Sequence, residues 1–204
     1  MNKRVYIEPA WKIHSYYQAL AVDPPQGYEF VTSESSLEKV AKAASKINLS
    51  YLLFSEIDKI VPLNLAKTYL DKFRRIQQNV DLTYSYDHLI VRKEPWVVDI
   101  EFVSLLVSYN LKHFTRYKGV VQKALASDYC RKIICGTEAA KKTVLLNLDC
   151  TKFNHKLETV PFAIRKKDFT KQFTNNKVKL LFVGSSNILG QFEIKGGGRG
   201  IGSL

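Results

Sequence analysis

Short apolar runs alternate with amphipathic segments over the first 165 residues of the chain. The runs have the length of strands and stop at turn residues, as in YLLFS (51–55) and KIIC (132–135). Between them, apolar positions recur at helical spacing, and Ser35, Glu38 and Pro62 supply helix-start signals. The predicted strands are 4–7, 28–32, 51–55, 82–85, 96–100, 132–135 and 158–163. The predicted helices are 35–47, 62–76, 102–109, 118–126 and 138–146.

This order of elements predicts a parallel sheet. Strands that alternate with helices pair in parallel, and such strands are apolar in continuous runs because helices cover both faces of the sheet. We therefore expect a doubly wound, Rossmann-like α/β domain over residues 1–165. The side chains expected at its centre are Leu52, Leu53, Ile133, Ile134 and Val160.

The composition changes after this domain. Residues 166–179 are polar and basic without apolar periodicity, which is typical of a linker. An apolar strand candidate (180–183) and the glycine-rich KGGGRG (195–200) follow. We interpret 180–204 as the first strand and loop of a second, truncated Rossmann-like domain, and the chain as a fragment. An unpaired apolar strand favours association, so 180–183 is expected to pair within the chain or across a dimer.

Composition excludes several classes of protein. The chain has 204 residues, 46% of them hydrophobic, and no apolar run of bilayer-spanning length. Basic residues at the N-terminus are followed by no apolar signal segment, so we expect a cytoplasmic protein. Three cysteines without CxxC spacing and four scattered histidines predict neither a metal site nor disulfides, and no cofactor is expected.

The charge is strongly basic. The chain has 31 Lys and Arg against 19 Asp and Glu, a net charge of +12. Such an excess suits nucleic acid, an anionic membrane surface or a phosphorylated substrate, and it also suits a solvated surface that keeps the protein in solution. No RNP motif, zinc finger or basic-zipper pattern occurs, so no specific nucleic-acid partner is expected.

Five segments together resemble a known family. In order they read DLTYS (81–85), PWVVDIE (95–101), YCRKIICGTEAAKK (129–142), ETVPFAIRKKDF (158–169) and LLFVGSSNILGQFEIKGG (180–197). Their order is similar to the landmarks of family-four retaining glycosyltransferases, which have the B-type fold of two Rossmann domains. The resemblance covers about residues 81–198. It implies transfer of a sugar from a nucleotide-sugar donor to an acceptor of unknown identity.

The resemblance also implies donor-binding residues near the C-terminus. Lys195 and Gly196 match the family's contact to the donor diphosphate, where a glycine lets the backbone approach phosphate. The family's phosphate-binding arginine is replaced here by Ser185, and the hydroxyls of Ser185 and Ser186, or the side chain of Arg199, are candidate substitutes. The family's E-x7-E motif is absent from this sequence, and we expect this chain alone to be inactive.

The acceptor side is implied by other residues. Glu101, and second to it Asp99, come at the end of a predicted strand, where a carboxylate could orient an acceptor hydroxyl or take its proton. Trp11, His14 and Glu138 are the candidate acceptor-binding residues. The structural alternatives are surface carboxylates for Glu101 and Asp99, a packed or surface histidine for His14, and a first-turn acid at a helix N-terminus for Glu138.

One alternative function stays open. The chain could be a noncatalytic basic α/β module that binds nucleic acid or an anionic lipid surface. Lys67, Lys72, Arg74 and Arg75 on the predicted 62–76 helix could make a peripheral contact with the inner face of the membrane, although a solvated helix face has the same composition.

Overall fold

The computed structural model describes residues 2–8, 20–31, 62–73, 79–86, 88–108 and 111–161. These residues lie within one unit, Met1–Ile164. The strands are β1 (Lys3–Glu8), β2 (Tyr28–Val31), β3 (Leu82–Tyr86), β4 (Trp96–Ile100), β5 (Cys130–Cys135) and β6 (Leu157–Thr159). The helices are α4 (Leu63–Asp71), α5 (Leu111–Ala126), α6 (Glu138–Asn147) and the 3₁₀ turns η1 (Val103–Val107) and η2 (Asn154–Lys156).

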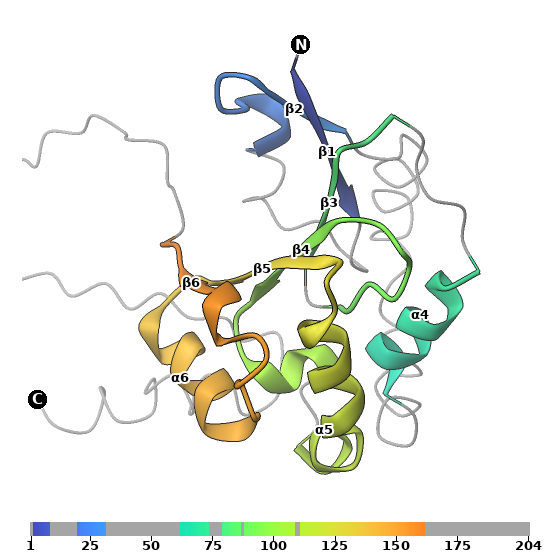
Figure 1. The fold of residues 1–204 in the computed structure, drawn as a ribbon, viewed down its shortest axis with the longest axis vertical. Coiled ribbons are helices and arrows are strands. Elements are labelled where there is room, and N and C mark those ends of the chain that lie inside the picture. Colours follow the sequence, from blue (N-terminus) through green and yellow to red (C-terminus); the bar gives the residue numbers. More distant parts are fainter. Residues whose placement is uncertain are drawn as a thin grey trace, which may run out of the picture. The chain divides into compact units, whose positions relative to one another are not determined.

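The six strands form one parallel sheet in the order β2-β1-β3-β4-β5-β6 (Figure 1). The register aligns Glu8 of β1 with Ser85 of β3, and Val98 of β4 with Ile133 of β5. The α/β architecture predicted from the alternating pattern is therefore confirmed.

The larger core lies on the face of the sheet that α4, η1, α5 and α6 cover (Figure 1). Trp96, Val98 and Ile100 of β4 point into it and are fully buried, and Ile133 of β5 lies beside them. The opposite face holds a smaller cluster, against which Leu20 packs from the connection between β1 and β2. All five residues of β4 are buried, as expected for a strand covered on both sides.

Three predicted elements differ clearly from the structure. The predicted strand 158–163 is the three-residue β6, which ends at Thr159. The predicted helix 118–126 begins seven residues earlier, at Leu111. The predicted helix 102–109 is only the 3₁₀ turn η1, which Ser108 ends with a left-handed backbone (φ 63°). The helix that follows could then start in a new direction.

The predicted core is partly confirmed. Ile133 is fully buried and Ile134 packs against the smaller cluster, but Val160 is 41% exposed. Val160 follows β6, which is an edge strand of the described sheet, so no further described strand shields it. Leu52 and Leu53 lie outside the described residues, as does the linker and everything beyond it. No helix in the described ranges has the length and apolar character needed to cross a bilayer.

Candidate functional site

The sheet has a switch point between β1 and β3. The chain leaves β1 toward β2 on one side and leaves β3 toward β4 on the other. Leu20, from the first connection, packs on the smaller core, whereas Leu89 and Ile90, from the second, lie in the larger core on the opposite face. In open parallel sheets, ligands bind outside the carboxyl ends of the strands at such a point. This edge is therefore the candidate site.

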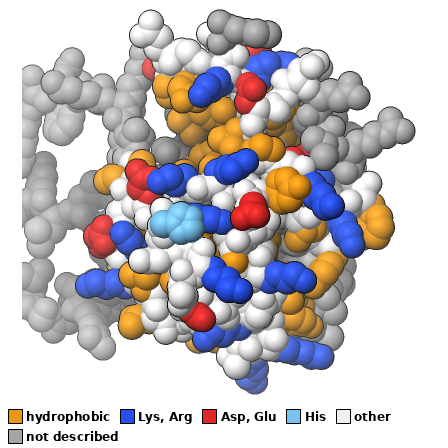
Figure 2. Space-filling view, viewed as in Figure 1, with side chains coloured by type: hydrophobic (Ala, Val, Ile, Leu, Met, Phe, Trp, Pro, Cys, Tyr) orange, Lys and Arg blue, Asp and Glu red, His pale blue; other side chains and the backbone are white. Residues whose placement is uncertain are grey.

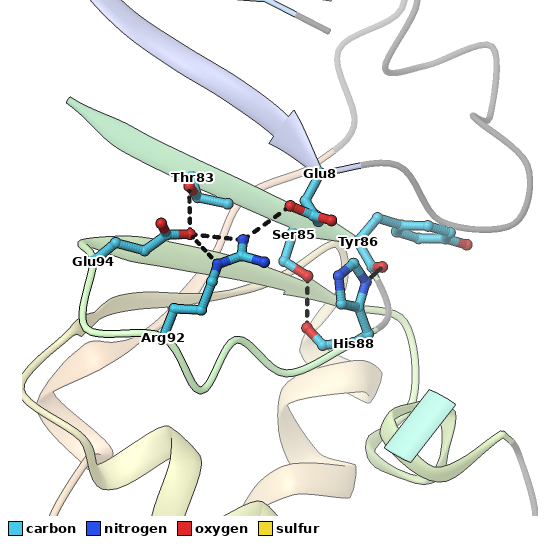
Figure 3. Close-up of polar contacts among 7 residues, drawn as sticks. All are labelled: Glu8, Thr83, Ser85, Tyr86, His88, Arg92 and Glu94. Atoms are coloured by element: carbon cyan, nitrogen blue, oxygen red, sulfur yellow. Dashed lines mark hydrogen bonds and ion pairs between the residues drawn. The ribbon is translucent and has the colours of Figure 1, made fainter. Parts of the chain in front are cut away.

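A buried ion-pair network supports the sheet just below this edge (Figure 3). The described part of the connection from β3 to β4, residues 88–95, contains no helix and places Arg92 against the sheet. Arg92 Nη2 donates to Glu8 Oε2 at 3.0 Å and to Glu94 Oε1 at 2.7 Å, and Arg92 Nε donates to Glu94 Oε1 at 3.0 Å. Glu8 is the last residue of β1. The guanidinium thus ties the carboxyl end of β1 to the β3–β4 connection.

The network is closed by Thr83 in β3, whose hydroxyl donates to Glu94 Oε1 at 3.1 Å. All four side chains are buried. Burial by itself would lower the pKa of Arg92, but the hydrogen bonds and negative charges of Glu94 and Glu8 outweigh it, so that the pKa is raised. Arg92 remains a cation, and the cluster positions the backbone of the edge.

Ser85 and His88 lie beside this network but form no nucleophile–base pair (Figure 3). The Ser85 hydroxyl donates to the backbone carbonyl of His88 at 2.6 Å. His88 Nδ1 lies 2.9 Å from the carbonyl of Tyr86 and, since a carbonyl only accepts, it is the protonated ring nitrogen. Both side chains are fully buried, and they fix the turn after β3.

The two candidate carboxylates of β4 have different surroundings. Asp99 lies inside β4 rather than after it, is buried, and accepts a hydrogen bond from the Tyr84 hydroxyl at 3.0 Å. Glu101 directly follows β4 and is exposed at the carboxyl edge. Of the two, only Glu101 is placed where a dissolved ligand could reach it.

Glu138 also lies at the carboxyl edge, two strands from the switch point. It opens α6 directly after β5, and it is exposed. Thr137 is the N-cap, since its hydroxyl accepts from the backbone N–H of Ala140 at 3.0 Å. Glu138 is thus the first-turn acid of the structural alternative, placed where a negative charge interacts favourably with the helix dipole.

The remaining predicted site residues are not placed. Trp11 and His14, and the donor-side Ser185, Lys195 and Gly196, lie outside the described residues. Within the described ranges no group of His, Cys, Asp or Glu could hold a metal ion. Burial raises the pKa of the Cys130 thiol to about 12, which disfavours its reactive thiolate.

Sequence reasoning missed the Arg92 network altogether. The pattern marked Glu8 only as the end of a strand, and HLIVRKEP (88–95) carried no recognised motif. The partners Glu8 and Arg92 are 84 positions apart in sequence. A buried ion-pair network between such distant residues can be predicted only once the strand order is known.

Searches of protein-family models, curated proteins and solved structures gave no significant match to this chain.

Proposed function

We propose that residues 1–165 are the acceptor-side domain of a glycosyltransferase that moves a sugar from a nucleotide-sugar donor to an acceptor. The observation that supports this best is the β1/β3 switch point with Glu101 exposed at the carboxyl end of the neighbouring strand β4. The acceptor lies along this edge. The parallel α/β fold agrees with the family that the five sequence segments resemble, although a fold alone does not define an activity.

In this proposal Glu101 faces the acceptor. Its carboxylate accepts a hydrogen bond from the acceptor hydroxyl and orients it, or takes its proton as a general base. Glu138 lies farther along the same edge and contacts the distal part of the acceptor. The donor diphosphate is bound by Lys195, Gly196 and Ser185.

The proposal is tested by binding, because acceptor recognition is separable from turnover. Saturation-transfer NMR on the full chain would use a panel of methyl pyranosides as acceptor probes, with UDP-glucose and GDP-mannose as donor probes. We expect at least one pyranoside to receive saturation. Glu101→Gln should reduce that signal at least threefold.

The matched control is Asp128→Asn. Asp128 is also an exposed carboxylate, but it precedes β5 and therefore lies at the amino edge of the sheet. The control should leave the signal unchanged. Absence of saturation in every pyranoside, or equal losses in the two variants, would argue against an acceptor site at the carboxyl edge.

A further inference from the structure

Helix α5 is the most basic element that the structure describes. Its 16 residues, LKHFTRYKGVVQKALA, contain Lys112, Arg116, Lys118 and Lys123 and no acidic residue. Its buried side chains, which include Phe114, face the core, while all four cationic side chains are exposed. Figure 2 shows Lys and Arg side chains spread over the lower part of the molecule, where Figure 1 places α5.

Three of these cations and one glycine form a single line along the helix. Residues 112, 116, 119 and 123 are spaced by four, three and four positions, which places them on one side of a helix of 3.6 residues per turn. At 1.5 Å per residue the line is about 16 Å long. We call Lys112, Arg116, Gly119 and Lys123 the α5 stripe. Lys118 lies off the stripe, on the side of Asp149, whose pKa is lowered chiefly by hydrogen bonds from Thr151 and to a smaller extent by the charges of Lys152 and Lys118.

Packing against the described residues gives no reason for a glycine at position 119. A Cβ added at this position would meet nothing within 4 Å. A glycine inside a helix weakens it relative to alanine, and the usual compensation is a close approach of another backbone or a ligand. Since no described residue lies close to Gly119, the bare backbone between Arg116 and Lys123 is suited to a partner that approaches from outside.

Lys112 is a second residue of the stripe that departs from a local rule of helix sequences. It stands in the first turn of α5, which contains no acidic residue, although the positive end of the helix dipole favours acids there. Local rules are commonly broken where a surface has a function. Both deviations fall on the α5 stripe.

We propose that the α5 stripe binds the phosphodiester backbone of a nucleic acid, without reading its bases. A line of cations complements a regularly spaced polyanion, and a bare glycine allows a rigid strand to approach closely. Arg116, whose guanidinium lies 5.5 Å from the centre of the Tyr117 ring, presents a fork that can bind phosphate oxygens. The one large exposed apolar side chain on α5, Leu111, stands at its first residue and off the stripe, so there is no apolar row to insert into a bilayer, which favours nucleic acid over lipid.

The test is fluorescence anisotropy of the full chain with a labelled DNA duplex and a labelled single-stranded RNA, each about 20 nucleotides long. Three phosphate contacts predict a plot of log affinity against log salt with a slope of about −2.7 for the duplex. The variant Lys112→Glu/Arg116→Glu/Lys123→Glu should lose at least tenfold in affinity at about 50 mM salt and flatten the slope.

The control variant is Lys93→Glu/Lys142→Glu/Lys152→Glu. These lysines are exposed and lie off α5, and their replacement lowers the net charge by the same amount. The affinity of this control variant for both probes should stay within threefold of that of the unmodified protein. Gly119→Leu separates docking from folding: it should weaken binding at least threefold without lowering the melting temperature, because leucine is the better helix former.

Three results would overturn the proposal. Equal losses in the stripe variant and the control would mean that overall charge, not this surface, binds the probe. Unchanged affinity in Gly119→Leu would mean that no partner approaches the helix backbone. Stripe-dependent binding to vesicles of about 30% phosphatidylserine, with no binding to either nucleic acid, would assign the surface to lipid instead.

Discussion

Removing the Arg92 cation should destabilise the protein more than any single loss of surface charge. The substitution Arg92→Met keeps a long side chain and takes away the positive charge and its hydrogen bonds. Glu8 and Glu94 then stay buried without the cation that now pairs with both, their side chains being 2% and 6% exposed. A buried carboxylate is costly when its loss of water is no longer balanced by the charge of a neighbouring cation.

The expected loss of stability follows from the number of carboxylates that Arg92 pairs with. Breaking a buried ion pair by removing one partner costs about 3–5 kcal/mol. Since two carboxylates lose the same guanidinium, while Thr83 still donates to Glu94, we expect a loss near the upper end, about 4–5 kcal/mol. With a urea m-value of about 2 kcal/mol/M, the unfolding midpoint should fall by roughly 2 M.

Urea unfolding followed by tryptophan fluorescence measures this loss, since Trp96 is fully buried. Lys93→Met is the control, because Lys93 is the next residue in the same connection and is exposed. It should change the free energy of unfolding by less than about 0.5 kcal/mol.

A compensating variant tests whether unbalanced buried charge causes the loss of stability. Glu8→Gln/Arg92→Met/Glu94→Gln removes all three charges and should recover more than half of the loss, because well-packed neutral residues can replace a buried ion pair at little cost. A loss below about 1 kcal/mol in Arg92→Met, or a triple variant less stable than the single one, would refute the assignment of this network as a buried, charge-balanced support.

Three further predictions concern other parts of the described unit. Lys156→Met should lower the free energy of unfolding by about 1–3 kcal/mol in urea titrations, because the buried Nζ donates to two backbone carbonyls at the end of α5, at 3.2 and 2.7 Å. Burial raises the pKa of Cys130 to about 12 and of Cys135 to about 11. Iodoacetamide at about pH 8 should therefore label the half-buried Cys150 first in the native protein, as read by mass spectrometry. Equally fast labelling of all three cysteines would contradict this burial. Gly119→Ala should raise the free energy of unfolding by roughly 0.5–1 kcal/mol, and a decrease would show that the new methyl group meets a neighbour.

The central strands could be predicted because their signal is local. WVVDI (96–100) follows a proline and is apolar at four of its five positions, and β4 has these same bounds in the structure. The N-cap at Thr137 was equally local, since the capping residue directly follows a strand and a turn glycine. These features need only their immediate neighbours in the sequence to form.

The start of α5 was not predictable in this way. Its first turns contain His113, Phe114, Thr115 and Tyr117, residue types that favour helix only weakly. The burial of His113 and Phe114 against the core outweighs those preferences. Tertiary packing, which a single sequence does not display, determined this boundary.

The β3–β4 connection escaped prediction for a different reason. Parallel strands are usually joined by a crossover of a dozen or more residues with a helix, whereas residues 87–95 cross without one in the part that the structure describes. Leu89 and Ile90 take over the covering role of a helix by filling the larger core. The same short path delivers Arg92 to Glu8, so the fold of this connection and the ion-pair network depend on each other.

The carboxylates near the switch point fall into two groups: some pair with side chains inside the protein, and Glu101 is exposed at the carboxyl edge. Glu8 and Glu94 share the guanidinium of Arg92, and Asp99 accepts from Tyr84, so all three are buried and engaged within the protein. Replacing any of them changes stability first, and a resulting loss of activity would not identify a catalytic group. Among the carboxylates that the structure describes, Glu101 is exposed and directly follows β4. A loss of ligand binding in Glu101→Gln with an unchanged free energy of unfolding would therefore support a binding site at the carboxyl edge.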